Sequence, residues 1–290
     1  MASIRLIKRR IKSTKNIGQI TKAMQMVAAS KMKKAQDQAI ATKPYSEKIL
    51  EIVKSLSLKT DPKLHPLLKQ QEEIKTYLCI LITTNKGLCG SLNTNLVRSL
   101  NNFIQKNINK GINFDFLTLG QKGQSFVLKT GGHYLADFSD LIPFTKAVIP
   151  IVKTISDGYL KEKYSRVYLF YNNFINALKQ EPVNKRILPL ILPNAEEEIQ
   201  LGKRKDVLYE PTAKEILDFL LPFYIETQVR GAILEGNASE HSARMMAMKN
   251  ATENAQALMD GLTLEYNKAR QQSITLEIAD ITTAKISLEK

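Results

Sequence analysis

The sequence predicts an α/β protein in which long N- and C-terminal helices form an antiparallel coiled coil and enclose, in chain order, a mostly parallel five-stranded sheet. Three observations lead to this prediction. Apolar or small residues recur at alternating steps of three and four near each end of the chain, which is the spacing of a seam between paired helices. Between the ends, apolar β-branched runs alternate with amphipathic segments, as they do in parallel α/β sheets. Charged and proline-containing stretches separate the two patterns.

The N-terminal coiled-coil helix is expected over residues 1–60, from an N-cap at Ser3 to about Leu58. Pro44 interrupts this helix and predicts a kink, and two prolines within residues 60–66 end it. A single exposed helix gains nothing from an apolar seam, so a partner helix must cover it. The seam residues are Ile4, Ile7, Ile11, Thr14, Gly18, Thr21, Ala28, Met32, Ala35 and Ala39.

The central domain is expected over residues 75–195, with the strand and helix alternation of a Rossmann-like domain. Asn172-Asn173 is interpreted as a tight turn, and the last strand as an edge strand because Pro189 cannot donate to a ladder. The expected strands are Thr76–Thr84, Asn113–Leu119, Ser165–Tyr171, Phe174–Leu178 and Val183–Leu192. The expected helices are Leu92–Ile108, a helix that opens at Gly120–Gly123, and Pro143–Lys163.

A charged loop is expected over residues 196–210, and the C-terminal coiled-coil helix over residues 211–290. Pro211 suits the first turn of this helix, and Pro222 predicts a kink near its start. The helix repeats the seam spacing and is expected to pair with residues 1–60. Its seam residues are Leu234, Ala238, Met245, Met248, Thr252, Ala255, Met259, Leu262, Tyr266 and Ala269.

The charge of the chain is concentrated at its start. Net charge is +14, and the first 36 residues hold ten Lys or Arg and no Asp or Glu. Such a stripe indicates a nucleic acid, an anionic membrane or an acidic protein surface as the partner, and we favour the acidic protein surface. A basic coiled-coil nucleic-acid-binding protein is the alternative function, but the basic and seam residues are interleaved here, whereas zipper proteins keep them in separate segments. Aromatic residues that would stack on single-stranded bases are also missing from this segment.

The sequence offers little sign of catalytic, metal or cofactor chemistry. The turn Gly87–Ser91 follows a strand and opens a helix, where backbone N–H groups could hold phosphate, but it lacks the glycine spacing of nucleotide-binding motifs. Three scattered histidines and two cysteines give no metal-site or catalytic spacing. No apolar window reaches the length of a transmembrane helix. We therefore expect a non-enzymatic protein that needs no cofactor and acts through shape and contact.

Four segments together resemble the γ subunits of F-type ATP synthases: residues 20–32, 87–93, 240–248 and 266–275. The resemblance covers essentially the whole chain. It implies a non-catalytic rotor shaft that couples rotation of a proton-driven membrane ring to conformational cycling of three catalytic β subunits, in ATP synthesis and in hydrolysis. It further implies α, β and ε subunits and the c-subunit membrane ring as partners, and no nucleic acid. The implied location is peripheral, on the cytoplasmic face of the bacterial inner membrane, with membrane contact only through the complex.

The resemblance also implies which residues contact the partners. Met24 and Lys31 match positions that face an acidic lever of β, and Lys86 matches a loop of the central domain that touches β. Positions near the far end of the shaft that contact α and β match Arg270, Gln271, Thr275 and Glu277. The region that meets ε and the membrane ring matches Lys203, Arg204, Lys205, Tyr209 and Glu210.

Overall fold

The computed structural model describes residues 4–57, 65–69, 71, 74–190 and 212–288. The chain forms two compact units. We call residues 1–29 and 244–290 the terminal unit and residues 30–243 the central unit. Helix α1 (Ile4–Ser57) and helix α6 (Ala213–Leu288) each contribute a segment to both units. The predicted charged loop 196–210 lies outside the described residues.

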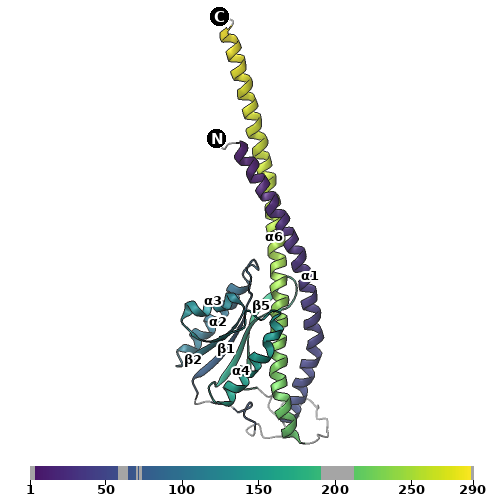
Figure 1. Ribbon diagram of the computed structural model, residues 1–290, viewed down its shortest axis with the longest axis vertical. Helices are drawn as coiled ribbons and strands as arrows, with labels where there is room; N and C mark the ends of the chain where they lie inside the picture. The colour runs from purple at the N-terminus through teal and green to yellow at the C-terminus, as the bar shows by residue number, and fades with distance from the viewer. Residues whose placement is uncertain (1–3, 58–64, 70, 72–73, 191–211, 289–290) are drawn as a thin grey trace. The chain divides into compact units, whose positions relative to one another are not determined.

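The terminal unit is an antiparallel helix pair, as the two seams predict. The hydroxyl groups of Thr21 and Thr252 are hydrogen bonded at 2.8 Å. A Cβ built on Gly18 would lie 3.6 Å from the Cβ of Ala255. Gly18 comes three residues before Thr21, whereas Ala255 comes three residues after Thr252. The two helices therefore run in opposite directions. Figure 1 shows the purple start of α1 beside the yellow part of α6, so the start of the chain is paired with a segment of the last helix.

The burial pattern confirms both predicted seams. Each of the ten seam residues on α1 and the ten on α6 is buried or half-buried, whereas the ten basic residues between positions 5 and 34 are all exposed. The buried side chains of the terminal unit are short or slender: Ile7, Thr14, Thr21, Ala28, Met248, Ala255 and Leu262. Small residues let helix axes approach closely, so the seam itself explains a slender two-helix unit.

The central unit is built on a five-stranded sheet with the strand order β3-β2-β1-β4-β5. The first four strands in this order run parallel, and β5 runs antiparallel to β4. The sheet is therefore mostly parallel, as the sequence predicts. The strands are β1 (Thr76–Ile82), β2 (Asn113–Leu119), β3 (His133–Asp137), β4 (Arg166–Phe174) and β5 (Gln180–Leu188).

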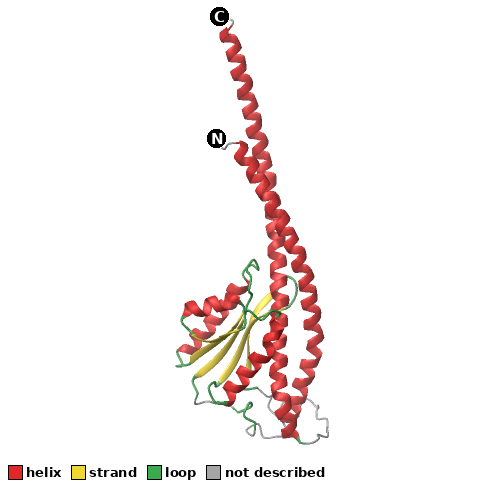
Figure 2. Cartoon of the chain, viewed as in Figure 1, coloured by secondary structure: helices red, strands yellow, loops and turns green. Residues whose placement is uncertain are grey.

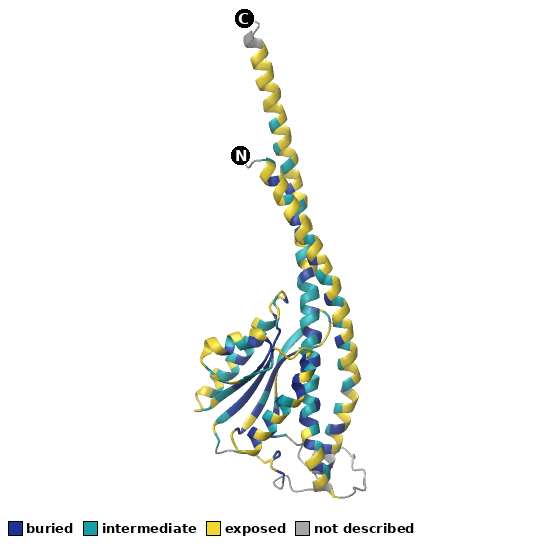
Figure 3. Cartoon of the chain, viewed as in Figure 1, coloured by how far each residue is buried: buried dark blue, intermediate teal, exposed yellow. Residues whose placement is uncertain are grey.

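Helices cover both faces of this sheet (Figure 2). Alternation along β1 sends Cys79 and Leu81 to one face, where α2 (Leu92–Ile108) and α3 (Gln121–Thr130) pack on them. Leu78, Ile80 and Ile82 point to the other face. The helical residues that share this second core come from the 3₁₀ turn η2 (Phe144–Ala147), from α4 (Val148–Leu160) and from the central-unit segments of α1 and α6. Figure 3 shows the strands as the most deeply buried part of this unit.

Two details of the predicted sheet are wrong. The strand expected at Phe174–Leu178 does not form, because β4 continues to Phe174 and carries Asn172 and Asn173 within it. The chain turns instead at residues 175–179, where the side-chain oxygen of Asn176 accepts hydrogen bonds from the backbone N–H groups of Leu178 and Lys179. Such a side-chain acceptor is a local turn signal.

The fifth strand is β3, which the sequence did not indicate. It is short, and its burial pattern shows no fully buried residue. It lies at one edge of the sheet, so it lacks the apolar run that marks the central strands. The predicted helix at 143–163 also begins later as an α-helix, because its first residues form η2. Both Pro44 and Pro222 lie within continuous helices.

Candidate interaction surfaces

The exposed face of α1 in the terminal unit is strongly basic. Its exposed cations are Arg5, Lys8, Arg9, Arg10, Lys12, Lys15 and Lys22. Within the part of the chain that the structure describes, none of them takes part in an ion pair, and the Lys22 ammonium only donates to the Gln25 side chain at 3.4 Å. The α6 segment of the unit carries equal numbers of basic and acidic residues. The surplus of positive charge is therefore a property of α1, and it suits an acidic partner surface.

Apolar side chains are exposed beside this charge. The exposed fractions of Ile17, Ile20 and Val27 are 52%, 59% and 56%. A groove of about 410 Å³ runs along the seam and is lined by Gly18, Ala23 and other residues from both helices. Met26, which is 60% exposed, lines this groove. Met24, one of the predicted contact residues, is half-buried on α1. Exposed apolar side chains grouped with a groove are typical of a surface that another protein covers.

The far end of α6 has no partner helix among the described residues. Carried along both helices, the register of Thr21 and Thr252 sets Ile4 opposite Ala269, so residues 270–288 continue beyond the start of α1 (Figure 1). Figure 3 shows this part of α6 as almost wholly exposed. The large apolar residues exposed here are Ile274, Leu276, Ile278 and Ile281. An isolated helix with this surface needs a protein environment around it.

The predicted contact residues near this end lie where a partner could reach them. Arg270, Gln271, Thr275 and Glu277 are all exposed. Their polar groups make only local contacts in the structure. The Thr275 hydroxyl donates to the Gln271 carbonyl oxygen at 2.9 Å, and the Ser273 hydroxyl donates to Glu277 at 3.3 Å.

The predicted contact loop of the central unit, which contains Lys86, is held rigidly from within. The Thr84 hydroxyl donates to the Lys86 carbonyl oxygen at 2.7 Å, and the Asn93 amide donates to the Thr84 hydroxyl at 2.8 Å. Leu88 has a positive φ of 62° and is 63% exposed. A leucine in this conformation and exposure is unusual, so the loop presents an apolar side chain on a fixed backbone.

The glycine turn that opens α3 is occupied by the protein's own side chains. At the start of α3, the N–H of Gly120 donates to Ser139 and that of Gln121 to Asn85, at 2.9 and 3.0 Å. The N–H of Gly123 donates to the Thr83 hydroxyl at 2.8 Å. These are the N–H groups that a phosphate would need. The glycine turn that opens α3 therefore serves packing and loop fixation.

The cysteines and the rest of the described chain give no sign of redox or metal chemistry. Cys79 is fully buried in the sheet, and burial raises the pKa of its thiol. No group of three or more His, Cys, Asp or Glu residues in the described ranges could hold a metal ion. None of the described helices is long and apolar enough to cross a membrane. The residues predicted to meet ε and the membrane ring, Lys203 to Glu210, lie outside the described residues.

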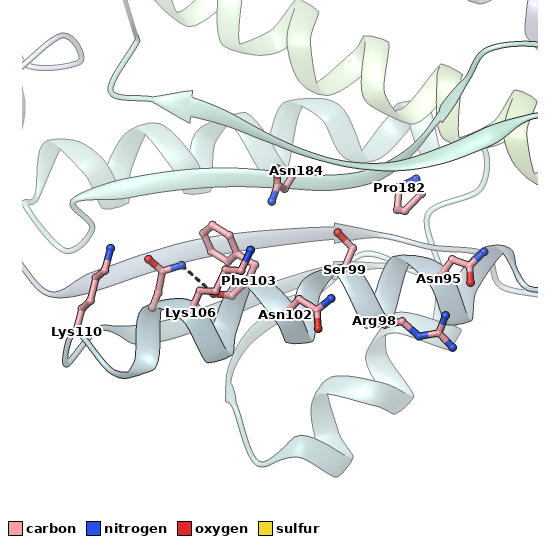
Figure 4. Close-up of a pocket in the computed structure, with 10 residues that line it drawn as sticks. Asn95, Arg98, Ser99, Asn102, Phe103, Lys106, Lys110, Pro182 and Asn184 are labelled. Atoms are coloured by element: carbon pink, nitrogen blue, oxygen red, sulfur yellow. Dashed lines mark hydrogen bonds between the residues drawn. The ribbon is translucent and has the colours of Figure 1, made fainter.

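A basic surface on the central unit was not predicted from the sequence. A groove of about 750 Å³ runs between α2 and β5 (Figure 4). Arg98 and Lys106 project from α2 along it, Lys110 follows just after the end of α2, and Pro182 and Asn184 border it from β5. The signal in the sequence is the presence of these cations on and just after one helix, which is recognisable only once the helix is placed beside the sheet edge.

The comparisons with known proteins agree with this arrangement. The family model described as ATP synthase matches residues 3–288. The ATP synthase gamma chain of Chloroflexus aurantiacus is 40% identical over 292 residues, which cover 99% of each chain. That of Coxiella burnetii is 42% identical over 292 residues and covers 100% of each chain.

Two solved structures share the fold. The rotor of Euglena gracilis mitochondrial ATP synthase includes a chain with a TM-score of 0.65 at 23% identity, covering 94% of this chain and 99% of that one. The central stalk and c-ring structure of Tetrahymena thermophila mitochondrial ATP synthase includes one with a TM-score of 0.57 at 27% identity, covering 80% and 99%. With the family model and the full-length relatives, these findings show that the chain belongs to the ATP synthase gamma chain family.

Proposed function

We propose that the chain is the central rotor shaft of a proton-translocating F-type ATP synthase and that it has no catalytic centre of its own. The observation that carries the proposal is the single-helix end of α6, residues 270–288, with its exposed apolar side chains. Such a surface is stable only inside a closed protein environment. A ring of α and β subunits supplies one. The central stalk and c-ring structure that contains the Tetrahymena relative supports the same role.

Asymmetry of the terminal unit explains how a chain without a catalytic centre can control catalysis in its partner subunits. One side of the unit is the acid-free face of α1, and the other is the charge-balanced face of α6. Three catalytic subunits around it would each meet a different surface. A partner shifts a conformational equilibrium only through differential contact with the two states. Rotation would therefore change the nucleotide affinity of each β subunit in turn, and by reciprocity nucleotide binding would drive rotation.

The basic face supports a specific set of contacts. Met24 and Lys31 would meet an acidic lever of β, because Lys31 is exposed and Met24 is only half-buried. Lys86 would meet β from the central unit, on the loop that Thr84 and Asn93 hold in place. The α and β subunits would also be contacted near the C-terminal end of α6, by Arg270, Gln271, Thr275 and Glu277.

The remaining partners are ε and the c-subunit ring, which Lys203, Arg204, Lys205, Tyr209 and Glu210 would meet. Through these partners the chain would sit on the cytoplasmic face of the bacterial inner membrane. It would touch the membrane only through the complex.

The test is reconstitution with α and β subunits, followed by ATP hydrolysis and ATP-driven proton uptake in membranes. The wild-type chain should co-purify with α and β and support proton uptake. Met24→Lys should lower the protons moved per ATP hydrolysed, because it adds a charge against the lever at a half-buried position. Leu128→Lys, at a 61% exposed position on α3, is the control for adding a lysine.

The possible outcomes distinguish the proposed shaft function from the proposed contact of Met24 with β. Failure of the wild-type chain to assemble with α and β would overturn the proposed function. An unchanged ratio of protons to ATP in Met24→Lys, with the wild-type chain coupled, would remove Met24 from the contact set and leave the shaft role standing.

A further inference from the structure

A second hollow on the central unit lies where three strands of the sheet begin. It has a volume of about 260 Å³. The chain enters β1, β2 and β4 beside it, at Lys75, Ile112 and Ser165, and the other lining residues include Gln71 and Tyr77. Pockets for drug-sized ligands have volumes of roughly 300–1,000 Å³, so this hollow suits a smaller molecule.

Four cations line the hollow: Lys75, Lys110, Arg166 and Arg186. The described lining includes no acidic side chain. Arg166 stacks over the Tyr77 ring, with its guanidinium carbon 5.4 Å from the ring centroid. Like charges gathered around one concavity repel each other and favour an anion between them.

Lys110 connects this hollow to the basic groove of Figure 4, because it lines both. Arg98 and Lys106 thus extend the positive surface along α2 towards the hollow. A positive groove that leads to a concave site raises the local concentration of anions.

Two buried polar atoms in the lining have no hydrogen-bond partner. They are the Nε of Arg186, which is a donor, and the Oε1 of Gln71, which is an acceptor. The other end of the Gln71 amide is fixed, since its Nε2 donates to the Tyr159 carbonyl oxygen at 3.1 Å. A buried polar atom left unpaired costs about 1–3 kcal/mol. Both atoms are enclosed by protein here. A ligand that accepts from a cation and donates one hydrogen bond would satisfy both once these side chains turn toward the hollow.

A phosphate group with one protonated oxygen meets both requirements. Its charged oxygens accept from arginine and lysine, and its P–O–H donates to an amide oxygen. Sulfate offers the same charge and shape at neutral pH but has no proton to donate. The two anions thus differ in the one feature that Gln71 distinguishes.

We propose that this hollow is a binding site for inorganic phosphate. Arg186 and Lys110 bind its charged oxygens, and Gln71 accepts from its protonated oxygen. The site is distinct from the glycine turn that opens α3, at the opposite ends of the strands, whose N–H groups are already used. The proposal does not depend on the rotor function.

Isothermal titration of the full-length chain with sodium phosphate at pH 7 and about 150 mM NaCl tests the proposal. We expect saturable binding of one phosphate with a Kd of about 1 mM or below. Sulfate should bind about tenfold more weakly, because it leaves Gln71 unpaired. Glycerol phosphate should also bind more weakly than inorganic phosphate, because a phosphate monoester has lost its second proton in most molecules at pH 7.

Charge-neutral variants locate the site. Arg186→Gln should raise the Kd about tenfold or more, and Lys110→Gln, at an exposed position that folding does not need, about threefold. Lys129→Gln, an exposed cation in the last turn of α3, should leave the Kd unchanged. Absence of saturation by wild-type chain, equal affinity for sulfate, or an equal loss in Lys129→Gln would each overturn the site.

Discussion

The two units of this chain are stabilised in different ways. The central unit buries large aliphatic and aromatic side chains on both faces of its sheet, among them Leu78, Ile80 and Phe170, all at 0% exposure. The terminal unit buries a single narrow seam and leaves aliphatic side chains of the same size exposed. Leu264 and Ile281, for example, are 73% and 70% exposed. The central unit therefore holds its own core, whereas the terminal unit keeps most of its apolar surface for other proteins.

This difference teaches how one chain can combine a rigid body with a shaft. Apolar burial is the main source of folding stability, so a unit that exposes its apolar residues gives up stability of its own. It gains that stability back only in the assembly. The predictions below test whether folding energy and partner contact are divided between the units in this way.

The largest expected difference comes from matched core truncations. Leu169→Ala removes a fully buried side chain from β4 and should lower the free energy of unfolding by about 2–5 kcal/mol. Leu262→Ala, at an 8% exposed seam position, should cost clearly less, because its site opens to solvent along two slender helices. Urea unfolding followed by circular dichroism measures both. Equal losses would contradict the division of stability between the units.

A glycine of the central unit gives the next largest effect. Gly120 has a φ of 109°, and a Cβ at this position would collide with the Thr83 carbonyl oxygen. Backbone strain and overpacking together predict a loss of about 3 kcal/mol for Gly120→Ala.

Gly131→Ala is the control, because Gly131 also has a positive φ, of 70°, but has no atom within 4 Å of the added Cβ. It should lose only about 1 kcal/mol. Thermal melts of both variants measure the difference. A Gly120→Ala chain as stable as Gly131→Ala would show that the α3 turn yields and is not tightly packed.

Arg270→Ala separates folding from contact. Arg270 is exposed on the unpaired part of α6, so the isolated chain should change stability by less than about 0.5 kcal/mol. In the reconstituted complex, turnover or assembly should fall about tenfold, because truncating a paired interface charge is costly. Lys268→Ala, an exposed cation two residues earlier, is the control. Wild-type rates with an intact complex would remove Arg270 from the contact set.

The sequence predicted the elements that repeat a strong period. Both seams, the bounds of α2 and the bounds of β2 follow from apolar spacing that neighbouring residues reinforce. It did not predict β3, because an edge strand without a buried residue has no apolar run to mark it. The paired asparagines 172 and 173 were misleading, since sheet pairing with β5 overrides their turn preference.

Some of the candidate sites could be predicted from the spacing of residues along the chain, and others could not. Exposure of Lys31, Arg270 and Glu277 could be expected from their place off the seam. The cationic hollow could not, because Lys75, Lys110, Arg166 and Arg186 come from four places in the chain. Only the strand order β2-β1-β4-β5 brings them together. Apolar periodicity along the chain predicts which residues share one face of a helix. It does not predict which strand ends become neighbours in the sheet.

The smallest expected effect concerns the closeness of the seam. A Cβ at Gly18 would lie 3.6 Å from the Cβ of Ala255, which is an ordinary van der Waals distance. Gly18→Ala should therefore stabilise the terminal unit by about 0.5–1 kcal/mol, since glycine within a helix is less favourable than alanine.

Gly261→Ala, at an exposed α6 position with nothing within 4 Å of the added Cβ, is the control and measures the helix preference alone. Gly18→Ala should match or exceed it in thermal melts, because it adds a seam contact. A destabilised Gly18→Ala chain would mean that the helices pack closer than a methyl group permits, and that the seam is a fixed-distance contact and not a tolerant one.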